Sequence, residues 1–123
     1  MSRPSQLALL RAHGIRPVKR RGQNFLLDAN VARAIARETL ALGARVLELG
    51  AGAGALTAPL LEGGARVTAV EVDRGLCELL RQEFGAEPRL RLLEADLARL
   101  DWEAALATLE PAARPGGLPG ATP

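Results

Sequence analysis

The chain of 123 residues is 48% hydrophobic and 24% charged with a formal net charge of +2, which suits one small domain and excludes a disordered or fibrous protein. Its apolar runs fall short of the roughly 18 residues that a membrane span needs, and its one cysteine, Cys77, excludes an internal disulfide. We therefore expect a cytoplasmic protein without a membrane partner or a metal site, in which Cys77 lies in the core.

The basic residues gather at the N-terminus. The first acidic residue is Asp28, so residues 1–27 carry six basic side chains and a charge of +6, while the remaining 10 basic and 14 acidic side chains give −4. A basic segment ahead of an acidic body is typical of an arm that contacts phosphates. The candidate contacts are Arg16, Lys19, Arg20 and Arg21. The alternative is a solvated, frayed terminus.

Two helical patterns precede the first predicted strand. Residues 4–14 have leucines at helical spacing and end at a glycine. Asp28 is placed to cap a second helix over residues 29–43, whose apolar stripe would consist of Val31, Ile35 and Leu42 together with several alanines. An irregular, basic segment that contains proline is expected between the two helices.

Three short apolar runs alternate with two helical patterns in the middle of the chain. The runs predict strands over residues 45–49, 66–72 and 89–95, and the helices between them cover residues 55–64 and 73–85. Strands that alternate with helices of this length predict an α/β fold with a parallel βαβαβ sheet. Residues 110–123, rich in Pro and Gly, are expected to form an irregular tail.

The turn after the first predicted strand is rich in glycine. Gly50, Gly52 and Gly54 stand in the sequence ELGAGAG, where missing side chains let the backbone pass close under a nucleoside-sized ligand. This spacing differs from the dinucleotide pattern Gly-x-Gly-x-x-Gly, and Glu48 would repel a pyrophosphate. The pattern therefore favours a ligand with a cationic group, such as the methionine ammonium of S-adenosylmethionine, over a nicotinamide dinucleotide.

Acidic side chains stand at or near the ends of all three predicted strands. Glu71 is placed to accept hydrogen bonds from ribose hydroxyls, and Asp96 from an adenine amine. With Glu48 they predict a nucleoside cradle at the carboxyl edge of the sheet. The alternative is a tight turn with a purely structural role. Asp73 is interpreted as a helix cap rather than as a ligand.

Four stretches in combination resemble one family: KRRGQNFLLD, VLELGAGAGALT, VTAVEVD and LLEADLARLDW. They are similar to the successive N-terminal motifs of the KsgA-type small-subunit ribosomal RNA adenine dimethyltransferases, over residues 18–102. The resemblance implies a Rossmann-like class I methyltransferase sheet in strand order 3-2-1, with N-terminal helices and with the second half of the sheet missing.

The resemblance also implies a cofactor, S-adenosylmethionine, and a partner, small-subunit rRNA or an immature small ribosomal subunit. The methionine end of the cofactor would lie against Asn24 and Leu26, for which a simple loop anchor is the alternative. The remaining cofactor-binding residues form the floor and the ribose and adenine contacts, and they are Gly50, Gly52, Glu71 and Asp96. The basic candidates before Asp28 would contact the RNA.

The chain departs from the family pattern in two places. Ala51 stands where the family has Pro, a mild change. Between Trp102 and Pro123 there is no Asn-(Leu or Ile)-Pro-(Tyr or Phe), the motif that in the family holds the target adenine. We therefore assign no catalytic residue and expect a truncated chain that has no N6-adenine dimethyltransferase activity alone. The alternative is a non-catalytic RNA-binding module of the same fold.

These inferences divide the chain into three parts: a basic N-terminal segment over residues 1–27, a cofactor-binding half-domain over residues 28–109 and a tail over residues 110–123. With the second half of the sheet missing, the first strand becomes an exposed apolar edge instead of a central strand. Such an edge predicts a tendency to associate rather than a stable monomer.

Overall fold

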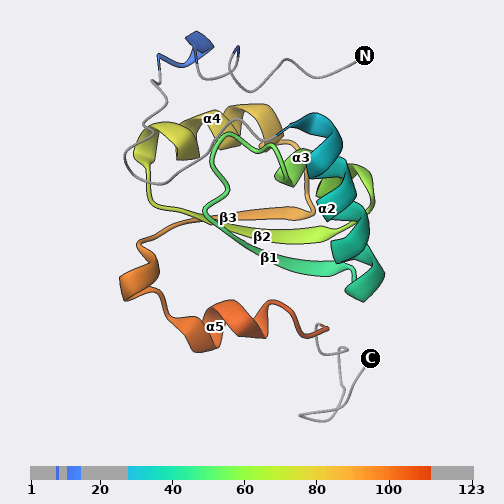
Figure 1. Ribbon diagram of the computed structural model, residues 1–123. Coiled ribbons are helices and arrows are strands. Elements are labelled where there is room, and N and C mark those ends of the chain that lie inside the picture. The colour runs from blue at the N-terminus through green and yellow to red at the C-terminus, as the bar shows by residue number, and fades with distance from the viewer. Residues whose placement is uncertain (1–7, 9–10, 15–27, 112–123) are drawn as a thin grey trace.

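The structure is a computed structural model that describes residue 8, residues 11–14 and residues 28–111 (Figure 1). Within these residues a three-stranded sheet is combined with helices before, between and after its strands. In chain order the elements are α2 (Ala29–Leu42), β1 (Arg45–Leu49), α3 (Thr57–Glu62), β2 (Arg66–Glu71), α4 (Arg74–Phe84), β3 (Leu90–Glu94), the 3-10 helix η2 (Leu97–Arg99) and α5 (Trp102–Ala107). The strands and helices predicted between residues 28 and 95 are therefore confirmed, with ends that differ by at most two residues.

The three strands are parallel and lie in the order β1-β2-β3, as the sequence predicted. Val46 is level with Val67, which in turn is level with Leu90. β2 is the central strand, whereas β1 pairs with β2 alone in the described part of the chain. The position of β1 at an edge is thus confirmed, while its association with other molecules stays a prediction.

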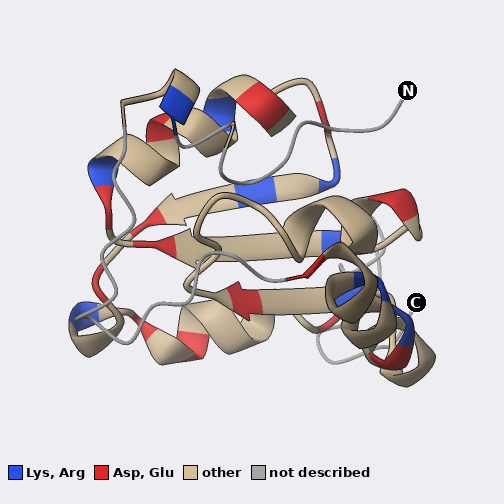
Figure 2. Cartoon of the chain, turned by 45° about the horizontal axis from the view of Figure 1, so that its top comes forward, with Lys and Arg blue, Asp and Glu red and all other residues tan. Residues whose placement is uncertain are grey.

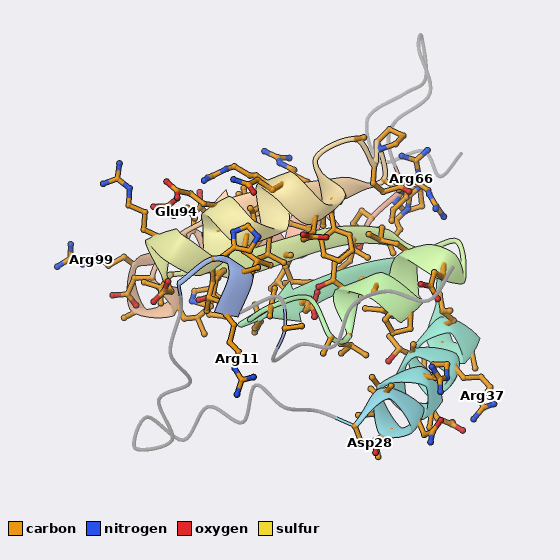
Figure 3. The ribbon with its side chains drawn as sticks, turned by 90° about the horizontal axis from the view of Figure 1, so that it is seen from above. Arg11, Asp28, Arg37, Arg66, Glu94 and Arg99 are labelled. Carbon is orange, nitrogen blue, oxygen red and sulfur yellow. The ribbon has the colours of Figure 1, made fainter. Side chains whose placement is uncertain are left out.

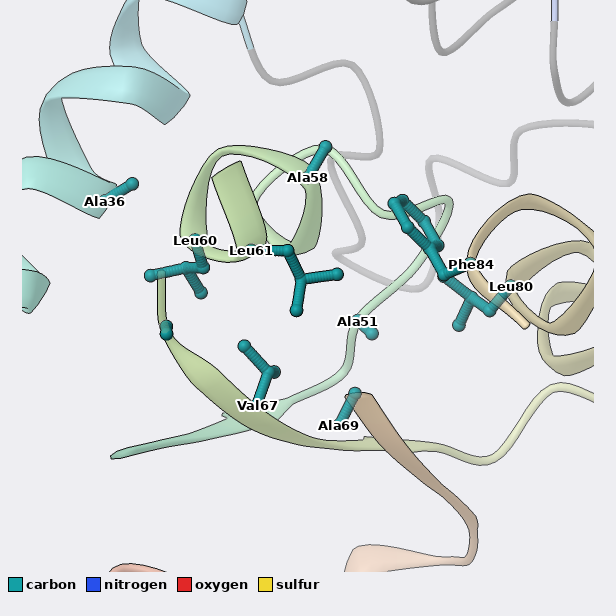
Figure 4. Packing of buried hydrophobic residues seen from close by; sticks show 10 residues of the cluster. Ala36, Ala51, Ala58, Leu60, Leu61, Val67, Ala69, Leu80 and Phe84 are labelled. Carbon is teal, nitrogen blue, oxygen red and sulfur yellow. The ribbon is translucent and has the colours of Figure 1, made fainter. Parts of the chain in front are cut away.

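The hydrophobic core lies between the sheet and the helices α3 and α4. Figure 1 shows these helices, with α2 beside α3, on one side of the sheet and α5 on the other. Figure 4 shows side chains of β2 facing side chains of α3 and α4, among them Val67, Leu60, Leu61, Leu80 and Phe84. This packing fixes the strands from which the loops at the carboxyl edge of the sheet emerge.

Two helices begin at the aspartates that the sequence predicted as caps. The carboxylate of Asp28 accepts hydrogen bonds from the backbone N–H groups of Asn30 and Val31, at 2.7 and 3.3 Å. The carboxylate of Asp73 accepts one from the N–H of Leu76 at 2.9 Å. Both side chains satisfy donors that the first turn of a helix leaves unpaired.

The apolar stripe predicted for α2 is confirmed for its alanines and wrong for its larger residues. The buried residues of this helix are Ala32 and Ala36, whereas the larger predicted ones stay largely exposed, at 47%, 40% and 91% for Val31, Ile35 and Leu42. α2 packs against α3, and alanines let two helix backbones approach closely. The contact line therefore follows the smallest side chains rather than the largest apolar ones.

The remaining expectations concern single features. Cys77 is fully buried in α4, as predicted. In the part of the chain that the structure describes, no helix is long and apolar enough to cross a membrane. Ala8, Arg11 and Ala12 are helical, but the rest of the helix predicted over residues 4–14 lies outside the described residues, as do residues 112–123 of the tail.

Candidate cofactor site

The loop that follows β1 lies at the carboxyl edge of the sheet and contains three glycines at positive φ. The φ angles of Gly50, Gly52 and Gly54 are 75°, 59° and 87°, a region that residues with side chains rarely adopt. The loop is attached to the sheet through Gly50, whose N–H donates to the carbonyl oxygen of Val70 in β2 at 2.8 Å. The glycines therefore set the path of the loop, as the sequence predicted.

Gly50 and Gly54 have different surroundings. A Cβ atom at Gly50 would meet no atom within 4 Å, so the loop has an open side there. A Cβ atom at Gly54 would lie 2.6 Å from Cε2 of Phe84 and 3.3 Å from Cδ2 of Leu80. Gly50 is thus free to face a ligand, whereas Gly54 is required by the packing of the loop against α4.

The carboxylate of Glu71, the last residue of β2, joins that strand to the glycine loop. Its Oε1 accepts a hydrogen bond from the backbone N–H of Gly52 at 2.8 Å. Its Oε2 accepts hydrogen bonds from the N–H groups of Val72 and Asp73, each at 3.0 Å. Glu71 is only 2% exposed. A carboxylate has about four acceptor positions, so these three bonds leave one, on the oxygen beside the loop.

Glu48 lies within β1, and its carboxylate meets α3. Its Oε1 accepts a hydrogen bond from the Thr57 hydroxyl at 2.6 Å, and the residue is 8% exposed. Burial raises the pKa of Glu48 to about 7; the hydrogen bond from Thr57 opposes this rise, and the charge of Glu71 adds to it. The carboxyl is therefore partly protonated near neutral pH, so its attraction for a cation depends on pH.

Asp96 follows β3 and is exposed at the same edge of the sheet. The N–H of Ala95 donates to the carbonyl oxygen of Glu71 at 3.0 Å, which places Asp96 beside the end of β2. The Asp96 carboxylate accepts a hydrogen bond from the N–H of Ala98 at 2.9 Å and so caps η2. Of the three acids predicted to form a cradle, Asp96 is the one that solvent reaches freely.

The structure brings four predicted cofactor-binding residues to one edge of the sheet: Gly50, Gly52, Glu71 and Asp96. The other predicted site residues lie outside the described residues, and they are Asn24, Leu26, Arg16, Lys19, Arg20 and Arg21. The sequence assigned no role to Thr57, although this hydroxyl stands in the first turn of the helix after the loop. Within the described residues no group of three or more His, Cys, Asp or Glu side chains is placed to hold a metal ion.

A family model described as ribosomal RNA adenine dimethylase matches residues 16–112. The chain belongs to this family. It is 50% identical over 97 residues to ribosomal RNA small subunit methyltransferase A of Magnetococcus marinus, a match that covers 78% of this chain and 35% of that protein. With the protein of the same name from Anaeromyxobacter sp. (strain K) it shares 50% identity over 117 residues, 94% of this chain and 40% of the relative. The chain thus spans two fifths or less of the length of these relatives.

Solved methyltransferase structures share the fold of this chain. The 23S rRNA methyltransferase ErmE is 33% identical with a TM-score of 0.52, over 63% of this chain and 32% of its own. The N-terminal domain of EvdMO1, solved with S-adenosylhomocysteine (SAH), is 28% identical with a TM-score of 0.54, over 69% and 35%. The glycopeptide N-methyltransferase MtfA, solved with S-adenosylmethionine, is 30% identical with a TM-score of 0.51, over 58% and 36%. The predicted Rossmann-like methyltransferase fold is confirmed, and the predicted cofactor agrees with the ligands of these proteins.

Proposed function

We propose that this chain holds S-adenosylmethionine for the N6-dimethylation of adenines in small-subunit rRNA. The observation that carries the proposal is the contact between the acid of the second strand and the loop of the first, in which Glu71 accepts the N–H of Gly52 beside the open side of Gly50. Membership of the dimethylase family supports the reaction. Methyltransferase neighbours of the same fold, solved with S-adenosylmethionine or its demethylated form, support the cofactor.

The described residues fit this cofactor. We assign the floor of the site to Gly50 and Gly52, the ribose to the acceptor position left on Oε1 of Glu71, and the adenine to the exposed Asp96. Glu71 is almost fully buried, so a ribose hydroxyl reaches its carboxylate only when the glycine loop moves aside. The glycines allow this movement because their backbone dihedrals are less restricted. Asn24 and Leu26 stay assigned to the methionine end.

The test of this site is calorimetric titration of the chain with S-adenosylmethionine and with NAD. We expect binding of the first in preference to the second. Glu71→Ala should weaken the binding of S-adenosylmethionine by about 1 to 3 kcal/mol, because a charge-assisted acceptor is lost. Glu94→Ala is the matched control, since Glu94 is level with Glu71 in β3 but pairs with Arg81 of α4 at 3.1 Å. Equal affinities of the two folded variants would contradict the assignment of Glu71.

The chain's part in the reaction is to bind and orient the cofactor. When bound, S-adenosylmethionine supplies an activated methyl group, so the main requirement is an adenine amine held in line about 3 to 3.5 Å away. The acids at the described edge are committed to the cofactor, to the loop or to a helix, as Glu94 is to Arg81 of α4, and we assign none of them to the adenine acceptor. We therefore expect no detectable transfer of labelled methyl groups to immature small subunits by this chain alone. Turnover comparable to that of a full-length relative would refute the expectation.

A non-catalytic RNA-binding module remains the second candidate. The observation in its favour is that the motif Asn-(Leu or Ile)-Pro-(Tyr or Phe) does not occur in this sequence after β3. The two candidates differ in one measurement. A cofactor-holding chain binds S-adenosylmethionine with an affinity that depends on Glu71, whereas a pure RNA-binding module binds rRNA with no such cofactor site.

A further inference from the structure

The acidic and basic residues of the three strands lie at opposite ends of the strands and face opposite sides of the sheet. Figure 2 shows acidic segments toward the arrowheads of the strands and basic segments toward their opposite ends. Figure 3 places the labelled side chains of Arg66 and Glu94 at opposite ends of the molecule. The acidic end is the candidate cofactor site. The basic end has no role in that site.

The strand carboxylates face the side of the sheet that α3 and α4 cover. Glu48 meets Thr57 of α3, and Glu94 pairs with Arg81 of α4. Glu71 belongs to the same side, because it alternates with residues of β2 that belong to the core between the sheet and these helices. Each acid thus has a partner within the chain or is buried in it.

Three arginines of the strands face the other side. Arg45, Arg66 and Arg91 each stand one position from a residue that packs in or against the core, so the alternation of a strand turns them away from α3 and α4. Arg45 and Arg66 are directly level in neighbouring strands. Arg91 is level with Thr68, two residues further along β2. We call these three side chains the arginine row.

The arginine row has no partner among the described residues. Arg45, Arg66 and Arg91 form no ion pair there, although α5 on the same side of the sheet begins at Asp101 and carries Glu103 in its first turn. By contrast, Arg89, which precedes β3, is bound to the carboxylate of Glu87 at 3.0 Å. Like charges that are level in neighbouring strands repel one another, and strands lie only about 4.8 Å apart. A ligand with several negative charges would relieve that repulsion.

We propose that the arginine row binds the sugar-phosphate backbone of RNA, away from the target adenine. Guanidinium groups match phosphate oxygens with two parallel hydrogen bonds, and a row across strands can follow successive phosphates. The row begins at the amino ends of the strands, about 16 Å from the glycine loop for a strand of five residues. A large rRNA reaches both places at once, whereas a small substrate does not. This inference rests on the proposed function, which supplies RNA as the substrate.

The test compares two double variants of the full chain. Their affinity for transcribed small-subunit rRNA is measured at several salt concentrations between about 50 and 200 mM. Arg45→Gln with Arg66→Gln removes two charges of the row. Arg33→Gln with Arg37→Gln removes two exposed charges of α2 and is the matched control. We expect the row variant to bind several-fold more weakly and to lower the slope of log affinity against log salt by about 2, one for each lost phosphate contact. The control should change the slope by less than half of that.

The outcomes separate this proposal from the proposed function. S-adenosylmethionine affinity and thermal unfolding of each variant, measured in parallel, show whether the fold and the cofactor site are intact. An equal effect of both double variants, or no RNA binding by the unaltered chain, would overturn the arginine row, whatever the cofactor result. Row-dependent binding of polyglutamate but not of RNA would overturn it in favour of an acidic protein partner. A chain that binds RNA through the row but binds no cofactor would leave the row standing and refute the proposed cofactor site.

Discussion

The protonation state of Glu48 couples the stability of this chain to pH. The pKa of Glu48 is about 7 in the folded chain, against 4.5 for an unperturbed glutamate such as that of the unfolded chain. The folded state therefore holds the proton more tightly than the unfolded state. The stabilisation by this proton is therefore complete below about pH 4.5. It is lost as pH rises through about 7, and the loss amounts to about 3 kcal/mol. Glu48→Gln keeps an acceptor for Thr57 and cannot ionise. We expect urea unfolding between pH 5 and 8 to show a steeper fall in stability for the unaltered chain than for Glu48→Gln; parallel curves would contradict this.

The same carboxyl gives cofactor binding the opposite dependence on pH. If the methionine ammonium lies near Glu48, it favours the ionised carboxyl, so binding should release protons near pH 7. The affinity of the unaltered chain for S-adenosylmethionine should thus rise between pH 6 and pH 8, while that of Glu48→Gln stays level. Calorimetry in buffers of different ionisation enthalpy measures the released protons directly. An affinity that is independent of pH would place the ammonium away from Glu48.

At the scale of elements, the glycine loop and α4 fit together through Gly54. Gly54→Ala adds a Cβ atom at a φ of 87° and within 2.6 Å of the ring of Phe84. Gly64→Ala is a matched control, because its φ is 93° and its nearest neighbour, Nη1 of Arg89, is 3.7 Å away. Both variants carry the backbone cost, and Gly54→Ala should lose a further 1 to 3 kcal/mol or so through overpacking. Urea unfolding of both variants gives the difference, and equal losses would show that the ring moves aside freely.

The elements also show which parts of the structure a sequence reveals. The caps Asp28 and Asp73 were predictable because a cap depends on residues two or three positions away. The exposure of Val31, Ile35 and Leu42 in α2 was not, because the buried face of this helix depends on where α3 lies. The acid at the end of β2 was predictable by its position, but its bond to Gly52 was not, since that contact spans 19 residues and depends on the register of two strands.

At the scale of the whole molecule, the chain has two sets of basic side chains that are candidates for RNA contacts. One is the N-terminal segment of residues 1–27, with six basic and no acidic side chains, and the other is the arginine row. Deletion of residues 1–21 should lower both the affinity for rRNA and the steepness of its salt dependence. Combination with Arg45→Gln and Arg66→Gln should add to the effect, because each lost phosphate contact lowers the salt slope by its own amount. An unchanged slope after the deletion would show that the N-terminal charges are only solvated.

The position of β1 at an edge of the sheet has a consequence for the timing of local opening. β2 is bonded on both sides and lies in the core, whereas β1, which leads directly into the glycine loop, is bonded on one side in the described residues. Backbone amides of β1 should therefore exchange with deuterium well before those of β2. A bound cofactor that rests on the loop should slow exchange in β1 far more than in β2. Hydrogen exchange with and without S-adenosylmethionine would thus show whether the bound cofactor suppresses local opening of β1.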